Sequence, residues 1–231
     1  MPAHILLLGH RGARRYAPEN TFAAFDLALK HGVDGFEFDL RCTRSRDLII
    51  CHDSRFKGLS VRRSTLRQIE AKCFAREEFP PSLPVVLERY SRRAFLNLEI
   101  KVRGVERLVH RLFRSIPPQH GYFISSFHPS VIRTLHRIDD SLVLGTISQT
   151  RWQLRRWEAL PALYVVPRYH LLSRRLIEEV HAAKKLVVTW TVNDAKQMLR
   201  AAEFGVDGII SDDTKLLWET LGRIDRFRNQ N

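Results

Sequence analysis

Short apolar segments alternate with amphipathic segments along the whole chain, and this alternation constrains the fold more strongly than any other feature. Short apolar runs predict strands at 6–9, 36–40, 96–100, 122–127, 142–147, 163–166, 187–192 and 208–211. Segments in which apolar residues recur about every 3.6 positions predict helices at 21–30, 105–116, 129–138, 173–184 and 195–204. Strands and helices that alternate in this way predict parallel βαβ units.

Eight such units in 231 residues use about 29 residues each, a size that fits a small (β/α)8 barrel. An open doubly wound sheet is the competing arrangement, but no dinucleotide-binding G-x-G-x-x-G signature follows the first strand. The sequence Gly-Val-Asp-Gly occurs at 32–35 and again at 205–208, where a glycine can end a helix in the left-handed conformation before a strand. We therefore predict an α/β fold, a single (β/α)8 TIM barrel formed by one domain of residues 1–231.

Three segments do not fit the simple repeat. Residues 47–52 are expected to form an extra strand that folds back on the second strand through a hairpin turn at 43–46. Residues 54–84 are a short insertion between the second and third barrel strands, and its prolines indicate an irregular connection over the barrel mouth. Residues 214–227 have the pattern of a last barrel helix, followed by a frayed tail.

The composition is that of an ordinary globular protein, with 44% hydrophobic and 27% charged residues, which excludes disordered and fibrous classes. No apolar run approaches the ~20 residues that a membrane-spanning helix requires. The three cysteines form no C-x-x-C motif, which argues against a disulfide framework or a thiolate zinc site. Because the first residues also lack the basic and apolar regions of a secretory signal, we expect a cytoplasmic protein.

The chain is strongly basic, since 38 Lys and Arg against 25 Asp and Glu give a net charge of +13. Such a surface favours anionic partners, although a solvated surface without a partner explains the charge equally well. The basic residues occur in scattered pairs without a zinc-finger or RNP-type signature, so we expect no specific nucleic-acid binding. Trp152, Trp157 and Phe56 could support a weak, reversible contact with an anionic membrane surface.

Three carboxylates are expected at neighbouring strand ends. Residues two apart in a strand point to the same side, so Glu37 and Asp39 share a face, as do Glu99 and Lys101. Active sites of (β/α)8 barrels are built at these carboxyl ends. Three converging carboxylates need a cation, and ligands that are all oxygen favour Mg²⁺ or Ca²⁺ over zinc. Local pairing of each acid with an arginine is the alternative.

Two histidines accompany these acids. His10 ends the first strand and His52 ends the extra strand, and imidazoles with pKa values near ~6.5 can serve as one base and one acid at neutral pH. Asp53 adjoins His52 and is placed to orient it. Arg11 and Lys101 supply fixed positive charge for a phosphate group.

In order and spacing, these residues resemble the signature of the glycerophosphodiester phosphodiesterase family. The matching motifs are His10-Arg11-Gly12, Glu19-Asn20-Thr21, Glu37-x-Asp39, His52-Asp53, Glu99-x-Lys101, Ser126-Phe127, Trp190-x-Val192-Asn193 and the segment Gly-Val-Asp-Gly-Ile-Ile-Ser-Asp at 205–212. Each motif alone is weak, whereas the ordered set spans nearly the whole chain.

The resemblance implies a metal-dependent hydrolase that cleaves glycerophosphodiesters into sn-glycerol 3-phosphate and an alcohol. It assigns one divalent cation to Glu37, Asp39 and Glu99. It assigns acid–base catalysis to His10 and His52, and phosphate binding to Arg11 and Lys101. In the mechanism that it implies, one histidine deprotonates a glycerol hydroxyl that attacks phosphorus, the other protonates the departing alkoxide, and water opens the cyclic phosphate. Glu19 is expected behind the site, and Trp190 either at the pocket wall or in the core.

Two departures from the family pattern leave alternatives open. Ser45-Arg46 stands where the family commonly has Asp-Gly, which puts the turn type and the position of His52 in question. The connection at 53–83 is short and would shape the alcohol side, which leaves the preferred headgroup open. A lysophospholipase D-like enzyme acting on lipid phosphodiesters is one alternative, based on the positive surface and the aromatic residues. A barrel that binds a phosphorylated ligand without catalysis is another. We expect a small-molecule glycerophosphodiester substrate and a monomer or small homo-oligomer.

Overall fold

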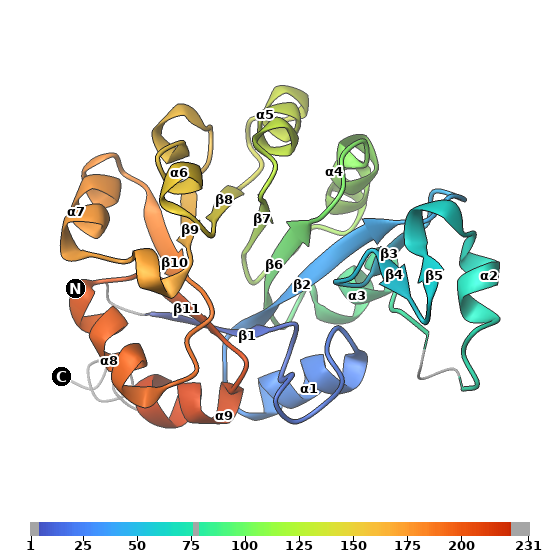
Figure 1. The fold of residues 1–231 in the computed structure, drawn as a ribbon, viewed down its shortest axis with the longest axis horizontal. Helices are drawn as coiled ribbons and strands as arrows, with labels where there is room; N and C mark the ends of the chain where they lie inside the picture. Colours follow the sequence, from blue (N-terminus) through green and yellow to red (C-terminus); the bar gives the residue numbers. More distant parts are fainter. Residues whose placement is uncertain (1–4, 76–78, 223–231) are drawn as a thin grey trace.

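The computed structural model describes residues 5–75 and 79–222. Eight parallel strands form a ring at its centre (Figure 1). They are β1 (Leu6–His10), β2 (Gly35–Cys42), β6 (Phe95–Ile100), β7 (Tyr122–Ser126), β8 (Leu144–Ser148), β9 (Tyr164–Pro167), β10 (Leu186–Thr189) and β11 (Gly208–Ser211). Because β1 pairs with both β2 and β11, the sheet closes into a barrel. The predicted (β/α)8 fold is confirmed.

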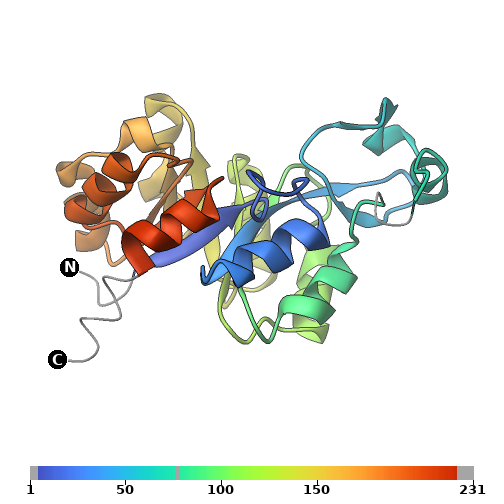
Figure 2. The same cartoon turned by 90° about the horizontal axis from the view of Figure 1, so that it is seen from below.

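Helices cover the outside of this ring (Figures 1 and 2). They are α1 (Phe22–Lys30), α3 (Leu83–Tyr90), α4 (Glu106–Ser115), α5 (Pro129–Ile138), α6 (Arg151–Leu154), α7 (Arg174–Ala182), α8 (Ala195–Phe204) and α9 (Thr214–Leu217). The five helices expected from periodicity have bounds within two residues of those expected. The sequence reasoning missed α3, because it begins among prolines. The sequence at 153–160 also has the pattern of a barrel helix, and the structure has α6 at its start and a 3-10 turn at Trp157–Ala159.

Local sequence explains where the helices begin and end. Thr21 caps α1 and Asp194 caps α8, each accepting a hydrogen bond from a backbone N–H of the first turn. Gly205 follows α8 with a φ of 93°, and Gly32 follows α1 with a φ of 96°. The repeated Gly-Val-Asp-Gly sequence therefore makes the two left-handed helix ends that its glycines predict.

Apolar side chains fill the barrel and the space between the barrel and its helices. The residues that pack inside the ring are Leu8, Phe123, Ile147, Val166, Val188 and Ile210. Larger clusters lie between strands and helices, where Phe25 of α1 stacks on Phe36 of β2 with ring centroids 4.2 Å apart. Burial of one such side chain contributes about 1.5–3 kcal/mol. The inner cluster forms the floor on which the site is built.

The segment between β2 and α3 forms a small lobe. Its strand β3 (Leu48–Ile50) pairs antiparallel with β2, which confirms the expected extra strand. The remaining elements are β4 (Arg55–Phe56), β5 (Leu59–Ser60), a 3-10 turn (Val61–Arg63) and α2 (Leu66–Glu70). The lobe stands to one side of the ring, so the expected path over the mouth is wrong (Figures 1 and 2). It packs there because it has an apolar cluster of its own around Ile49 and Ile69.

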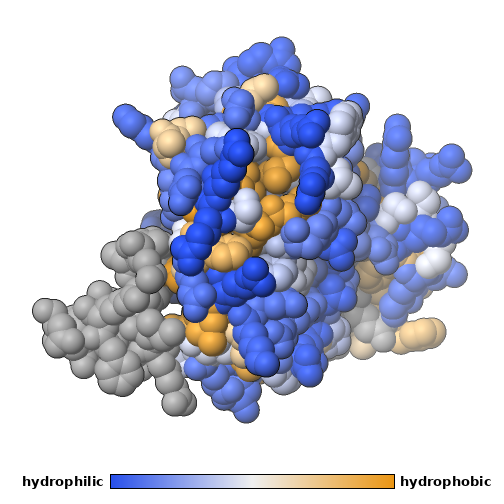
Figure 3. All heavy atoms as spheres, turned by 60° about the vertical axis from the view of Figure 1, so that its left-hand side comes forward, coloured by the Kyte–Doolittle hydropathy of each residue, from blue (hydrophilic) through white to orange (hydrophobic). Residues whose placement is uncertain are grey.

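The described part of the expected helix at 214–227 is helical. Helix α9 continues into a wider turn at Trp218–Gly222, and the rest of the expected helix 214–227 lies outside the described residues. Among the described helices, none combines the length and the apolar character needed to cross a membrane. Figure 3 shows one face of the molecule, which is mostly hydrophilic with apolar side chains gathered in smaller patches.

Candidate active site

A cavity of about 240 Å³ lies at the carboxyl ends of the barrel strands. His10 ends β1, Glu37 of β2 lies beside it in register, Glu99 is the last residue but one of β6, and Trp190 follows β10. Every residue predicted to act directly lines this cavity except Asp39, which is buried beside its acidic wall. The barrel thus brings together residues that are distant in the sequence.

Glu37 and Asp39 of β2 and Glu99 of β6 form the acidic centre of the cavity. Asp39 lies in register with Glu99 on the neighbouring strand, and strand alternation places Glu37 on the same face. Each of the three offers an oxygen atom, and these atoms lie within 4.8 Å of one another. All three residues are buried. Carboxylates this close repel one another unless positive charge lies among them.

Two cations face the acidic centre. Lys101 Nζ lies 3.0 Å from Asp39 Oδ1 and 2.6 Å from Glu99 Oε1, and Arg11 Nε lies 3.2 Å from Asp39 Oδ2. Burial opposes ionisation of Asp39, but Lys101 and Arg11 outweigh it and hold the pKa of Asp39 below its ordinary value. Burial raises the pKa of Glu99 to about 7 and raises that of Glu37 well above its ordinary value. The positive charge of Lys101 and Arg11 therefore does not offset the effect of burial on the pKa values of Glu37 and Glu99.

Buried carboxylate oxygens with few partners indicate that the centre suits a divalent cation. Among the described residues, Glu37 Oε1 is buried without a hydrogen-bond partner, and Asp39 Oδ1 and Glu99 Oε1 are buried with Lys101 Nζ as their shared contact. Buried oxygens normally have such a partner. Three carboxylate oxygens at this spacing are ligands that Mg²⁺ and Ca²⁺ prefer. These residues could hold one divalent cation.

His10 is oriented by the carboxylate of Asp212. Its Nδ1 lies 2.6 Å from Asp212 Oδ1, and because a carboxylate only accepts, Nδ1 carries hydrogen and Nε2 is left to accept a proton. Asn193 Nδ2 donates to Asp212 Oδ2 over 2.7 Å and fixes that carboxylate. Burial lowers the pKa of His10, and Asp212 opposes the effect. His10 Nε2 lies 3.9 Å from Glu37 Oε2, at the edge of the acidic centre.

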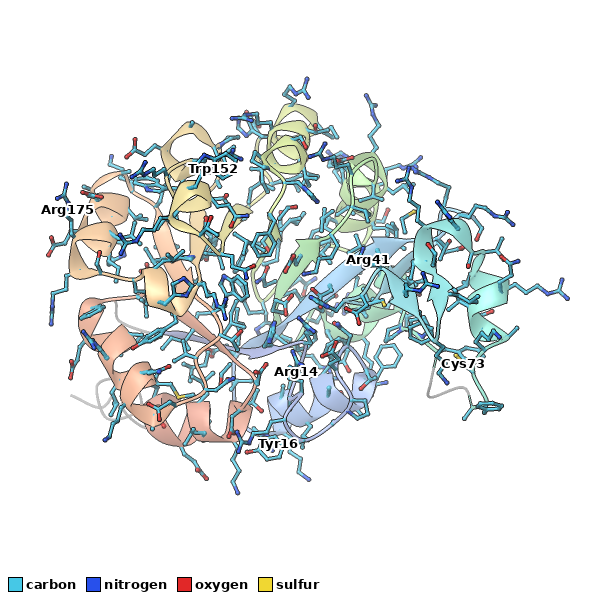
Figure 4. All side chains as sticks on the ribbon, in the orientation of Figure 1. Arg14, Tyr16, Arg41, Cys73, Trp152 and Arg175 are labelled. Atoms are coloured by element: carbon cyan, nitrogen blue, oxygen red, sulfur yellow. The ribbon has the colours of Figure 1, made fainter. Side chains whose placement is uncertain are left out.

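His52 lies just after the extra strand β3 and is also paired with a carboxylate. Its Nδ1 lies 2.9 Å from Oδ1 of Asp53, the neighbouring residue that was expected to orient it. Arg41 Nε donates to the carbonyl of His52 over 2.8 Å, and Figure 4 shows Arg41 at this edge of the barrel. Arg46 stands in the hairpin turn where the family commonly has glycine, and it adopts the left-handed conformation with a φ of 70°. With this turn, His52 reaches the cavity lining.

The loop after β1 connects the acidic centre to its surroundings. The backbone N–H of Arg11, which has a φ of 54°, donates to Glu37 Oε2 over 3.1 Å. Arg11 Nη1 donates to Glu19 Oε1 over 2.9 Å, which places Glu19 behind the cavity. Asn20 Nδ2 donates to Asp39 Oδ2 over 2.9 Å. The loop therefore orients two of the three carboxylates.

The opposite wall of the cavity is mainly apolar and aromatic. Trp190 lines this wall, where its Nε1 donates to the carbonyl of Val166 over 3.1 Å. Its ring meets that of Phe127 edge to face, with centroids 5.7 Å apart. Of the aromatic residues considered for membrane contact, Trp157 is buried, whereas Trp152 is exposed on α6 at the outer edge of the ring (Figure 4).

Sequence reasoning missed several residues of the site. Asp212, Asn193 and Asn20 lie in the matching motifs, but their roles are not predictable from them, because their contacts depend on barrel closure or on the conformation of the loop after β1. Gln149 and Arg168 line the cavity and follow β8 and β9 directly. Their position just past a strand end is the signal that could have found them.

Comparisons with known proteins identify a family and similar folds. The model of the Glycerophosphoryl diester phosphodiesterase family matches residues 10–107 and 95–216. YhdW of Bacillus subtilis (strain 168) is 29% identical over 229 residues, 89% of this chain and 93% of that protein. A glycerophosphodiester phosphodiesterase of Caldanaerobacter subterraneus subsp. tengcongensis is 29% identical over 234 residues, 92% of this chain and 96% of that protein.

A similar fold is found in a phosphodiesterase of Oleispira antarctica, solved in complex with the product sn-glycerol-3-phosphate. That structure has a TM-score of 0.81 at 21% identity, and the match covers 94% of this chain and 96% of that chain. The family match extends over most of the sequence and includes both histidines and all three acids of the cavity. The chain therefore belongs to the Glycerophosphoryl diester phosphodiesterase family and is a phosphoric diester hydrolase.

Proposed function

We propose that the chain hydrolyses glycerophosphodiesters to sn-glycerol 3-phosphate and an alcohol. In this proposal Glu37, Asp39 and Glu99 hold one divalent cation, and His10 and His52 act as general acid and base. One observation carries it: three buried carboxylates, each with an oxygen within 4.8 Å of the other two, lie together with two histidines whose Nδ1 atoms are paired with aspartates.

The charges of the site support the binding of a phosphodiester. When all three carboxylates are ionised, as cation binding requires, their charge exceeds that of Lys101 and Arg11 by one, and this excess would repel a phosphodiester anion. A bound divalent cation would make the centre net positive and would stabilise negative charge on the phosphoryl oxygens. Lys101 and Arg11 are then able to donate hydrogen bonds to the phosphate instead of only neutralising the acids.

The two histidines divide the proton transfers between them. One accepts a proton at Nε2 from a glycerol hydroxyl, whose oxygen attacks phosphorus to form a cyclic phosphate. The other donates a proton to the alcohol oxygen as its bond to phosphorus breaks. Water then opens the cyclic phosphate, with the two histidines in exchanged roles. Asp212 and Asp53 hold the imidazoles in place and stabilise the imidazolium that forms on each.

The ligand set leaves two ions as candidates, Mg²⁺ and Ca²⁺, because both prefer carboxylate oxygens. Hydrolysis needs no residue from a second chain in this scheme. We accordingly propose that residues 1–231 act as one domain, as a monomer or a small homo-oligomer, on a small-molecule substrate.

The catalytic part is tested by release of sn-glycerol 3-phosphate from glycerophosphocholine and glycerophosphoethanolamine in a coupled assay. His10→Ala and His52→Ala are each expected to lower kcat by at least about 10²-fold, since each removes one member of an acid–base pair. His136→Ala, a change of an exposed histidine on α5, serves as the control and is expected to keep normal turnover. Near-normal turnover of either cavity variant would contradict the proposed roles.

A further inference from the structure

Arg168 lines the cavity but has no part in the chemistry proposed above. We propose that Arg168 binds an anionic group on the alcohol half of the substrate. Glycerophosphodiesters whose alcohol carries a carboxylate or a phosphate are then preferred over esters of choline or ethanolamine. This inference rests on the proposed function, because it names the substrate class of the same site.

The backbone fixes Arg168 at the mouth of the barrel. Arg168 directly follows β9, its N–H donates to the carbonyl of Ser148 over 2.8 Å, and it forms a bridge with Trp190 of the next strand end. In the closed ring, β9 lies four strands from β2 in either direction. Arg168 therefore stands across the mouth from the strand that carries Glu37 and Asp39.

Exposure distinguishes this side of the cavity from the acidic side. Arg168 and Gln149 are the two exposed residues of the lining, whereas the others are buried or half-buried. The glycerol phosphate half is common to all substrates and has to reach the buried carboxylates and histidines. The alcohol half differs in size between substrates and needs the open side. Arg168 is consequently placed to contact the alcohol half.

The guanidinium of Arg168 is available for such a contact. Among the described residues, no Asp or Glu side chain forms an ion pair with Arg168, while Arg11 and Lys101 in the same cavity are both paired. The carboxylates of the lining, Glu37 and Glu99, belong to the acidic centre. A guanidinium can donate two parallel hydrogen bonds to one carboxylate or phosphate, which gives direction as well as charge.

The charges on this wall disfavour a choline or ethanolamine group. Lys101 Nζ lies 5.8 Å from the centroid of Phe127, so positive charge already adjoins one of the aromatic rings that line the cavity. A cationic alcohol would therefore meet Arg168 on one side and Lys101 on the other.

Glycerophosphoserine and glycerophosphoethanolamine form a matched pair of substrates, because they differ by one carboxylate. The measurement is kcat/KM for each, by release of sn-glycerol 3-phosphate, in the wild type, Arg168→Gln and Arg175→Gln. Arg175 is exposed on α7 at the outer edge of the ring, so its change removes the same charge away from the cavity (Figure 4). We expect the wild type and Arg175→Gln to prefer glycerophosphoserine by at least about fivefold, and Arg168→Gln to lose that preference.

Three results would overturn the inference. One is an equal kcat/KM ratio in the wild type and Arg168→Gln. Another is an equal loss on both substrates in Arg168→Gln, which would place Arg168 on the shared glycerol phosphate half. The third is the absence of hydrolysis of both substrates by the wild type, which refutes the proposed function as well. A Tm of Arg168→Gln equal to that of the wild type would verify that the fold of the variant is intact.

Discussion

Asp212→Asn isolates the contribution of the carboxylate behind His10. In the structure Asp212 Oδ1 lies 2.6 Å from His10 Nδ1, while Oδ2 accepts a hydrogen bond from Asn193 over 2.7 Å. An asparagine keeps the size of the side chain but removes its charge. If its oxygen stays on Asn193, its NH₂ group faces His10 and forces the hydrogen onto Nε2. The nitrogen that has to exchange a proton is then blocked.

The hydrogen bond between His10 and Asp212 sets the size of the effect. A hydrogen bond to a charged group contributes about 1.5–3 kcal/mol. Each 1.36 kcal/mol in the barrier changes the rate tenfold, so kcat is expected to fall about 10- to 150-fold in Asp212→Asn. KM is expected to change less, because Asp212 contacts His10 and not the acidic centre.

The assay is steady-state release of sn-glycerol 3-phosphate by wild type, Asp212→Asn and a control. Asp139→Asn is a matched control, because Asp139, which follows α5, has its Oδ2 3.0 Å from Nε2 of His110 on α4 in a similar pair outside the barrel. The control is expected to retain the wild-type kcat. If Asp212→Asn and Asp139→Asn have the same kcat, the orienting role of Asp212 is refuted.

Three further predictions concern the cation and the fold. Excess Mg²⁺ or Ca²⁺ is expected to raise the Tm of the wild type but not that of Glu37→Gln. At a cation concentration of 100 times Kd, the wild type is expected to be stabilised by about 2.7 kcal/mol. An equal rise of Tm in both proteins would contradict the role of Glu37 as a ligand. Burial raises the pKa of Glu99 to about 7 and raises that of Glu37, so protons compete with the cation. The Kd for the cation, measured by calorimetry, should fall as pH rises through about 7, and a constant Kd would argue against these ligands. Gly35→Ala is expected to cost about 3 kcal/mol or more in urea unfolding, because a Cβ there lies 1.9 Å from the carbonyl oxygen of Phe95. Gly58→Ala, with no atom within 4 Å of its Cβ but a φ of 82°, should cost about 1 kcal/mol, and equal losses would refute the steric argument.

The parts of the structure that depend on local pattern could be predicted from the sequence. Apolar periodicity identifies the barrel strands, and strand alternation alone places Glu37 and Asp39 on one face. Neighbouring parallel strands then bring Glu99 beside Asp39. The acidic centre could therefore be predicted from the sequence, because each step of the prediction concerns one strand or its direct neighbour.

The parts that depend on barrel closure or loop geometry could not be predicted. His10 and Asp212 are 202 positions apart and meet because β1 lies beside β11. The contact of Asn20 with Asp39 depends on the left-handed residues Arg11 and Asn20 in the loop after β1. The lobe beside the ring is stabilised by its own apolar cluster, and no periodic pattern in the sequence predicts that cluster. These features arise from tertiary contacts that the sequence pattern does not encode locally.

The central claim is that carboxylates of β2 and β6 hold a cation on which phosphodiester hydrolysis depends. The most direct measurement is release of sn-glycerol 3-phosphate by wild type and Glu37→Gln, first stripped with EDTA and then supplied with Mg²⁺ or Ca²⁺. Glu158→Gln, a change of an exposed glutamate, is the matched control. We predict no turnover in EDTA, recovery with one or both ions in the wild type and Glu158→Gln, and no recovery in Glu37→Gln. Full turnover in EDTA, or full recovery of Glu37→Gln, would contradict the claim.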